Sequence, residues 1–183
     1  MTVIDRIPYE NLPFDLKARL APRVERLGYL GEFFQLGAHQ PEALGHFIGF
    51  TETLKEKLPD NITELTALTI ATWSANAYER VQHERLCLKL GFTEEWVRTI
   101  ERLDPATALS ITPVERAAQA LVLAVVISMG REAQAERDAF LALTDAQTLV
   151  GVLFTIGRYL SHAAFCNTLG VVQPFESPLA PTG

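Results

Sequence analysis

Helix-capping signals recur along the chain and set its secondary structure. The segment Thr112-Pro113-Val114-Glu115 supplies a capping hydroxyl, a proline at the first helical position and a carboxylate three residues after the cap. Thr144-Asp145-Ala146-Gln147 repeats the capping-box spacing, and Thr93 precedes two acidic residues, which helix N-termini favour. Glycines stand where helix C-caps are expected, at Gly91, Gly130 and Gly170. Sustained apolar–polar alternation is absent from the sequence, so an all-α fold is predicted.

The chain divides into three parts. Residues 1–24 carry three prolines and are interpreted as an N-terminal arm with short helical pieces around Phe14–Leu20. Residues 25–170 form the predicted helical domain. Residues 171–183 are rich in proline and therefore non-helical, either loose or strapped across a neighbouring subunit.

Within the domain we expect helices over residues 25–36 and 41–58, and another beginning at Glu64 with Thr63 as its cap. The last helix, residues 144–169, is apolar around much of its circumference. Such a helix is central to a core or lies at a subunit interface. The sequence therefore favours a homo-oligomer, without indicating its order.

Composition narrows the classes of function. The 183 residues are 48% hydrophobic and 21% charged, as in ordinary globular domains. A net charge of −6 offers no general attraction for nucleic acid or anionic membranes, and the longest charge-free apolar run, 117–130, is shorter than the ~20 residues that span a bilayer. We therefore expect neither partner. The N-terminus has no signal-peptide core, and the two cysteines form no CxxC motif, which favours a cytoplasmic location.

The segment 64–91 carries the residues best suited to chemistry. Asn76, Glu79 and His83 share one face of a helix, and Cys87 continues that face one turn later. In one straight helix Glu64 would lie about 28 Å from His83, at 1.5 Å per residue.

A chain reversal would bring the two residues together. Ser74-Ala75-Asn76 is the candidate break, because Asn76 is a good N-cap and Glu79 follows it at capping-box spacing. Two antiparallel helices would then place Glu64 beside His83.

These residues resemble a known family. Glu64, the pair Tyr78-Glu79 and His83, followed by LxLGFTEE, look like the carboxymuconolactone decarboxylase family, which shares the all-helical fold of alkylhydroperoxidase D (AhpD). The resemblance covers most of residues 25–170. It implies an AhpD-like helical bundle and acid–base chemistry, without cofactor or metal, on a small carboxylated or lactone-like substrate.

The alkylhydroperoxidase branch of that fold places a CxxC motif between its Glu and its His. Glu64 and His83 match the ends of this pattern, but the cysteine positions fall on Asn76 and Glu79. Without a thiolate there, disulfide-cycling peroxide reduction is disfavoured. The decarboxylase branch commonly has Tyr-Glu ahead of its His, as here, although Arg80 stands where that branch usually has Trp.

The resemblance predicts a role for each of these residues. His83 supplies a proton, while Glu64 and Glu79 orient and recharge it. Glu79 has the alternative of closing the Asn76 cap. The expected substrate contacts are Tyr78, Asn76 and Arg80.

Two other classes of function remain open, and so does whether the chain is an enzyme at all. One is peroxide reduction through Cys87, although a cysteine in an apolar stretch is more often a small buried hydrophobe. The other is a non-catalytic helical oligomer that binds a ligand. Arg158 and His162 are interpreted as a polar stripe on a core helix, with the alternative that they line the same pocket.

Overall fold

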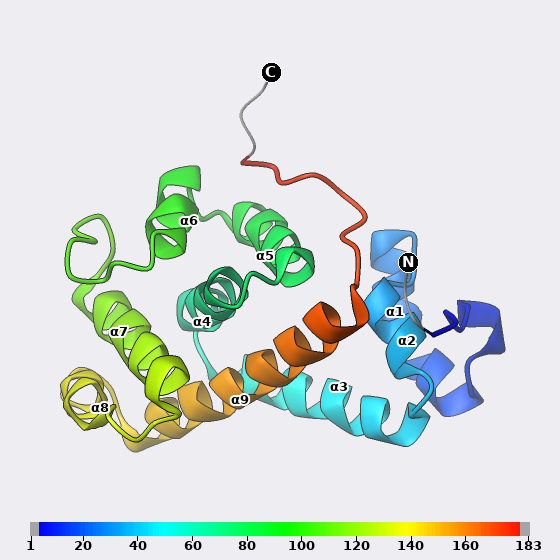
Figure 1. Cartoon of the computed structure of the whole chain (residues 1–183), viewed down its shortest axis with the longest axis horizontal. Coiled ribbons are helices and arrows are strands. Elements are labelled where there is room, and N and C mark those ends of the chain that lie inside the picture. The colour runs from blue at the N-terminus through cyan, green and yellow to red at the C-terminus, as the bar shows by residue number, and fades with distance from the viewer. Residues whose placement is uncertain (1–3, 180–183) are drawn as a thin grey trace.

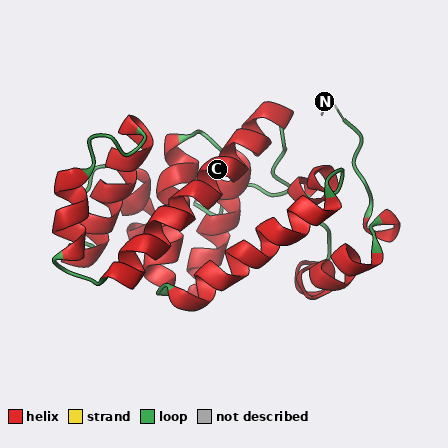
Figure 2. Ribbon diagram, turned by 90° about the horizontal axis from the view of Figure 1, so that it is seen from below, coloured by secondary structure: helices red, strands yellow, loops and turns green. Residues whose placement is uncertain are grey.

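The protein is described by a computed structural model covering residues 4–179, and every regular element within that range is helical (Figure 2). The predicted all-α fold is confirmed. The elements are a 3-10 turn at Tyr9–Asn11 and the helices α1 (Phe14–Leu27), α2 (Glu32–Gly37), α3 (Pro41–Lys57), α4 (Asp60–Trp73), α5 (Ala77–Leu90), α6 (Glu94–Glu101), α7 (Pro113–Ser128), α8 (Gln134–Leu141) and α9 (Ala146–Leu169).

Two hydrophobic cores share the long helix α9, which runs from the α7–α8 end of the molecule to the α1–α2 end (Figure 1). The larger core joins α4, α6, α7, α8 and α9, with Leu65 and Ile156 among its buried residues. The smaller core joins α1, α2 and α3 to Tyr78 of α5 and Cys166 of α9. The region between the cores is therefore bordered by α3, α5 and α9.

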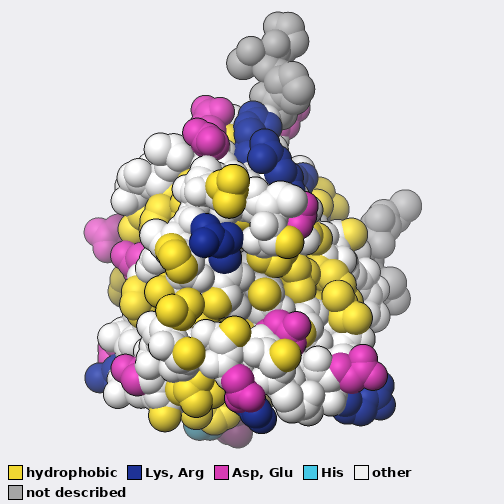
Figure 3. Space-filling model, turned by 90° about the vertical axis from the view of Figure 1, so that its left-hand side faces the viewer, with side chains coloured by type: hydrophobic (Ala, Val, Ile, Leu, Met, Phe, Trp, Pro, Cys, Tyr) yellow, Lys and Arg dark blue, Asp and Glu magenta, His cyan; other side chains and the backbone are white. Residues whose placement is uncertain are grey.

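The helix α9 is long and apolar enough to cross a membrane by length and composition alone. Its packing accounts for that composition, because Val152, Ile156 and Tyr159 are buried in the larger core. Its other side exposes Val150, Leu153 and Phe154. At the α6–α8 end, hydrophobic side chains are interspersed with charged and other polar ones (Figure 3).

The capping box predicted at Thr112 is present and becomes a tertiary junction. Thr112 Oγ1 accepts from the Glu115 backbone N–H, and the Glu115 carboxylate accepts from the Thr112 backbone N–H. Glu115 also accepts from Asn61 Nδ2 at 3.0 Å and from Trp96 Nε1 at 3.1 Å. Through Glu115, the capping box at the start of α7 is therefore also hydrogen-bonded to α4 and α6.

The N-terminal boundaries differ from those predicted. The helix α1 extends to Leu27 and ends at Gly28, whose φ of 78° is left-handed, so no helix spans residues 25–36. In the segment interpreted as an arm, residues 1–24, Leu16 and Leu20 are buried in the smaller core. Residues 1–3 of it lie outside the described range.

Two other helix starts were misplaced by a few residues. The helix α4 begins at Asp60, directly after Pro59, and Thr63 is buried within it rather than capping it. The helix α9 is capped by Asp145, whose carboxylate accepts from the Thr148 backbone N–H at 2.7 Å. Asp145, one residue later, thus replaces the predicted Thr144 cap.

The proline-rich tail is non-helical through Leu179, as predicted, and it packs on its own chain. The Leu179 side chain is buried, and its carbonyl accepts from Arg98 Nη2 at 2.8 Å. Ser177 Oγ donates to the Glu84 carboxylate. The tail therefore straps α5 and α6 of the same chain; its residues 180–183 lie outside the described range.

Beneath this strap, two carboxyl groups face each other. Arg80 Nη1 lies 3.1 Å from Glu84 Oε1 and 3.7 Å from Glu101 Oε1. Burial and the neighbouring Glu84 carboxylate raise the pKa of Glu101 to about 7.

Because the pKa of Glu101 is higher in the folded than in the unfolded chain, its protonated form stabilises the fold at low pH. This contribution is present below pH 4.5 and is lost as the pH rises through about 7. We expect Glu101→Gln to lose less stability than the wild type across that interval, measured as urea midpoints at several pH values. The exposed Glu95→Gln is the control, and parallel profiles for all three proteins would contradict the expectation.

Candidate active site

The reversal between α4 and α5 has the form that the sequence predicted. Ala75 adopts a left-handed φ of 52°, and Asn76 Oδ1 accepts from the Glu79 backbone N–H at 3.2 Å. The turn sends α5 back along α4, so that Glu64 and His83 are in direct contact. The contact required by the hypothesis is therefore present.

His83 lies between two carboxylates. Its Nδ1 donates to Glu64 Oε2, and its Nε2 lies 3.1 Å from Glu79 Oε1 and 3.2 Å from the Tyr159 hydroxyl. Burial alone would lower the pKa of His83, but Glu64, together with Glu79, raises it above the ordinary value. The two carboxylates thus favour the protonated form of the imidazole.

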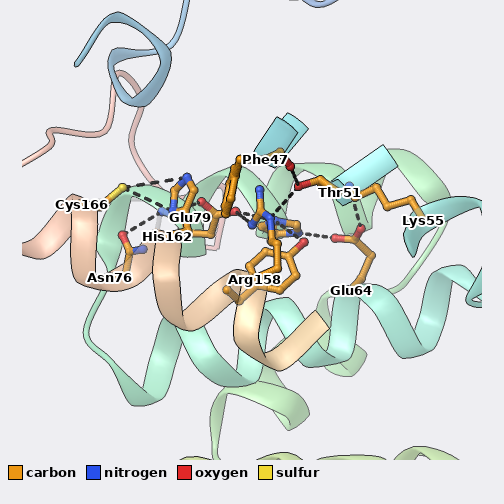
Figure 4. Close-up of polar contacts among 11 residues, drawn as sticks. Phe47, Thr51, Lys55, Glu64, Asn76, Glu79, Arg158, His162 and Cys166 are labelled. Carbon is orange, nitrogen blue, oxygen red and sulfur yellow. Dashed lines mark hydrogen bonds and ion pairs between the residues drawn. The ribbon is translucent and has the colours of Figure 1, made fainter. Parts of the chain in front are cut away.

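Glu79 is the second centre of the network (Figure 4). Besides contacting His83, it accepts from Arg158 Nη1 at 3.0 Å and lies 2.7 Å from His162 Nδ1. Burial would raise the pKa of Glu79, but His162 and Arg158 hold it well below its ordinary value. The carboxylate therefore belongs to the network, while only the backbone N–H of Glu79 takes part in the Asn76 cap.

Arg158 and His162 correct the sequence interpretation. They are not merely a polar stripe on a core helix, since both contact Glu79 and line the same cavity. Arg158 Nε also donates to Thr51 Oγ1 at 3.2 Å, and its guanidinium lies 4.1 Å from the centre of the Tyr159 ring. The sequence feature that could have linked Arg158 to His162 is their spacing of four residues on the last helix, which places both side chains on one face.

A cavity of about 490 Å³ opens onto this network. Among its lining residues are Tyr78, Glu79, His83, Tyr159 and His162. Glu64 is not among them; it contacts Nδ1 of His83, whereas Nε2 lies next to Glu79 and Tyr159, which do line the cavity.

The predicted substrate contacts divide into two groups. Tyr78 lines the cavity, and a Cβ at Gly31 would lie only 2.5 Å from its hydroxyl oxygen, so this close approach requires glycine. Asn76 is buried at the α5 cap, and Arg80 pairs with Glu84 under the tail. The structure brings neither Asn76 nor Arg80 to the cavity.

Neither cysteine reaches the cavity. Cys87 is fully buried in the larger core, and Cys166 is buried with its sulfur 3.3 Å from His162 Nδ1. Burial raises the pKa of both thiols, which keeps them protonated. Within residues 4–179, no group of three or more His, Cys, Asp or Glu side chains is placed to hold a metal ion.

Comparison with solved structures identifies the fold. The structure of an uncharacterized peroxidase-related protein with an AhpD core from Ralstonia eutropha JMP134 superposes with a TM-score of 0.81 at 17% identity, covering 94% of this chain and 92% of that one. A protein of unknown function from Agrobacterium tumefaciens, described as a candidate AhpD antioxidant defence protein, gives 0.71 at 17% identity, with coverage of 77% and 97%.

A third similar structure carries a different activity. The debrominase Bmp8 in complex with 2,3,4-tribromopyrrole gives a TM-score of 0.78 at 13% identity, covering 94% of this chain and 91% of that one. No protein-family model and no curated protein sequence matches this chain. The chain therefore has the AhpD-like fold, and at these identities the likeness is one of fold.

The Asn76 cap should support both the fold and the site. Asn76→Ala removes the acceptor at the start of α5, and Thr93→Ala removes the equivalent acceptor at the start of α6. Each is expected to lower the free energy of unfolding by about 1 kcal/mol in urea titrations. Only Asn76→Ala should also shift the imidazole NMR signals of His83, because that cap sets the position of α5. An unchanged His83 spectrum in Asn76→Ala would contradict this view of the turn.

Proposed function

We propose that this protein is a cofactor-independent acid–base enzyme acting on a small carboxylated or lactone-like molecule, with decarboxylation as the favoured reaction. The observation that carries the proposal is the imidazole of His83 held between Glu64 and Glu79, with Nε2 next to two cavity-lining residues, Glu79 and Tyr159. A buried imidazolium with two carboxylate partners can deliver a proton and be recharged. The proposal includes a cytoplasmic location, consistent with two free, buried thiols.

The proposed step balances without an external oxidant or reductant. The bond between the substrate's carboxylate carbon and its neighbouring carbon breaks, and carbon dioxide leaves. The electron pair stays on the neighbouring carbon and delocalises into the adjacent unsaturated lactone. His83 protonates that carbon through Nε2, and the neutral imidazole regains a proton from water, favoured by the Glu64 carboxylate at Nδ1.

The sequence does not indicate which arginine would hold the substrate carboxylate, and Arg158 is the one proposed here. Its Nε and Nη1 bind Thr51 and Glu79, and its remaining guanidinium nitrogen has no hydrogen-bond partner among residues 4–179. It lines the cavity beside His83 and Tyr159. A planar guanidinium suits a carboxylate better than a lysine would.

The placement of the thiols argues against peroxide reduction, even though two structures of similar fold are described as peroxidase-related or antioxidant. That chemistry needs an accessible thiolate. Cys87 and Cys166 are both buried away from the cavity. The debrominase of similar fold illustrates that this scaffold serves more than one reaction, so the site rather than the fold must identify the activity.

The activity test compares the wild type with His83→Asn and Glu64→Gln on a carboxylated muconolactone and related unsaturated lactone acids, followed by ultraviolet absorbance. We expect His83→Asn to lose about 10²- to 10⁴-fold in kcat, the usual contribution of a general acid. Glu64→Gln should lose less, because it leaves the proton donor in place. His46→Asn, an exposed histidine away from the cavity, should keep full activity.

Two results would contradict the proposal. One is turnover that persists in a correctly folded His83→Asn protein. The other is a wild type that catalyses neither decarboxylation nor exchange of substrate hydrogen with solvent across the whole panel. The second result would favour the non-catalytic ligand-binding oligomer.

We also propose that the chain self-associates through the outer side of α9. Val150, Leu153 and Phe154 are exposed there, and Phe154 packs edge-on against the exposed Phe50 of α3 with ring centroids 5.8 Å apart. These residues make a cluster from two helices, and a second copy of the chain presents an identical cluster. A two-fold contact would pair the two.

Light scattering after size exclusion tests this contact. Phe154→Glu should lower the molar mass of the particle, because it places a charge in the proposed interface. Ile127→Glu is the matched control, since Ile127 is equally apolar and more exposed but lies at the end of α7. A wild-type monomer, or an equal effect of both substitutions, would contradict the proposal.

A further inference from the structure

The cavity concentrates positive charge in an otherwise acidic protein. Six of the chain's 16 lysines and arginines line it, namely Arg23, Arg26, Lys55, Arg85, Lys89 and Arg158. Among the lining residues of the described chain, only Glu79 is acidic. The chain as a whole carries a charge of −6, so this gathering of cations is a local feature of the cavity.

Two of the six cations have acidic partners inside the site. Arg158 pairs with Glu79 at 3.0 Å, and Lys55 Nζ lies 3.8 Å from Glu64 Oε1. The other four are here named the mouth cations: Arg23 and Arg26 from α1, and Arg85 and Lys89 from α5. Within residues 4–179, none of the four has a carboxylate at ion-pair distance.

Two of the three arginines among them, Arg85 and Arg23, lie over aromatic rings instead. Arg85 lies 3.9 Å from the ring centre of Phe175 in the C-terminal tail, and Arg23 lies 4.6 Å from that of Phe34. Such contacts orient a guanidinium over a ring without neutralising its charge. The cations are therefore placed at the cavity but keep their capacity to bind an anion.

The cations at the mouth repel one another. Burial, followed by the charges of Arg158 and Arg26, lowers the pKa of Arg23, and the nearby Glu52 opposes this only in part. Clustered cations of this kind destabilise the unliganded protein, and a bound anion would remove that repulsion.

We propose that the mouth cations form an anion subsite for a multiply charged oxyanion group, of the phosphate or polycarboxylate class, carried by the ligand at the end remote from His83. Guanidinium groups bind such oxyanions through paired N–H donors, and four cations suit a group of charge −2 or more better than a single carboxylate. The cavity volume of about 490 Å³ leaves room for a ligand that reaches from the mouth to His83.

The inference rests on the proposed function only in placing the reacting end of the ligand at His83. Anion binding at the mouth requires no turnover, so it is measured separately. Isothermal titration with inorganic pyrophosphate and with citrate, at low ionic strength, provides the two probe anions. Tighter binding of pyrophosphate would assign the subsite to the phosphate class, and tighter binding of citrate would assign it to the polycarboxylate class.

The decisive variant is R23Q/R26Q, compared with R102Q/R131Q, which removes the same charge from exposed arginines that do not line the cavity. We expect R23Q/R26Q to weaken binding of the preferred anion at least about tenfold, while R102Q/R131Q leaves it unchanged. Wild-type affinity should fall as sodium chloride is raised.

The mouth cations of α5, Arg85 and Lys89, provide an independent check. R85Q/K89Q should weaken the same binding, because α5 supplies the other half of the mouth cations. The unliganded R23Q/R26Q protein should keep or raise its thermal midpoint, since it loses repulsion rather than a favourable pair. If one of the two double variants fails to fold, the binding measured with the other still tests the subsite.

Each outcome has a definite meaning. The subsite is overturned if neither anion binds the wild type. It is also overturned if both R23Q/R26Q and R85Q/K89Q retain the binding. Binding that depends on the mouth cations and survives in His83→Asn supports the subsite, even where the decarboxylase assay fails. Turnover with no pyrophosphate or citrate binding would support the proposed function and overturn this inference.

Discussion

The contact between Glu64 and His83 depends on the reversal of the chain at Ser74–Asn76. Nineteen residues separate the pair, and only an antiparallel arrangement of α4 and α5 lets them meet. Asn76 begins α5 by accepting from the Glu79 backbone N–H, while the Glu79 side chain is held by His83, Arg158 and His162. A capping interaction therefore stands at the start of the helix that carries two members of a buried ionic site.

Each buried carboxylate of that site has cationic or hydrogen-bonding partners, which explains how it can be buried. Two carboxylates, Glu64 and Glu79, face His83, whose pKa they raise, and the cations Arg158 and Lys55. Burial lowers the pKa of His162. Removing one member would leave an unpaired buried charge, which is strongly destabilising. Stability and chemistry at this site are consequently coupled, so activity tests on the His83 and Glu64 variants need a separate measurement of folding.

The sequence predicted what local signals encode: the all-α class, the capping box at Thr112 and the reversal at Asn76. It misjudged Arg158 and His162, because their contact with Glu79 joins α5 to α9 and nothing in local spacing specifies that packing. Arg80 was misplaced for a related reason: it directly follows Glu79, and one residue turns the side chain about 100° around the helix, towards Glu84 and Glu101. The misplaced helix between residues 25 and 36 reflects the strong effect of Gly28, whose left-handed conformation ends α1.

The two positions at which an alkylhydroperoxidase would carry cysteines explain how this site differs from a thiol site. Asn76 caps α5, and Glu79 provides a permanent negative charge that is held by Arg158 and His162 of α9. A thiol there would cycle between charged and neutral forms, whereas this carboxylate has its pKa held well below its ordinary value. The permanent charge favours the imidazolium form of His83, so the same Glu–His pair is suited to donating a proton rather than activating a nucleophile.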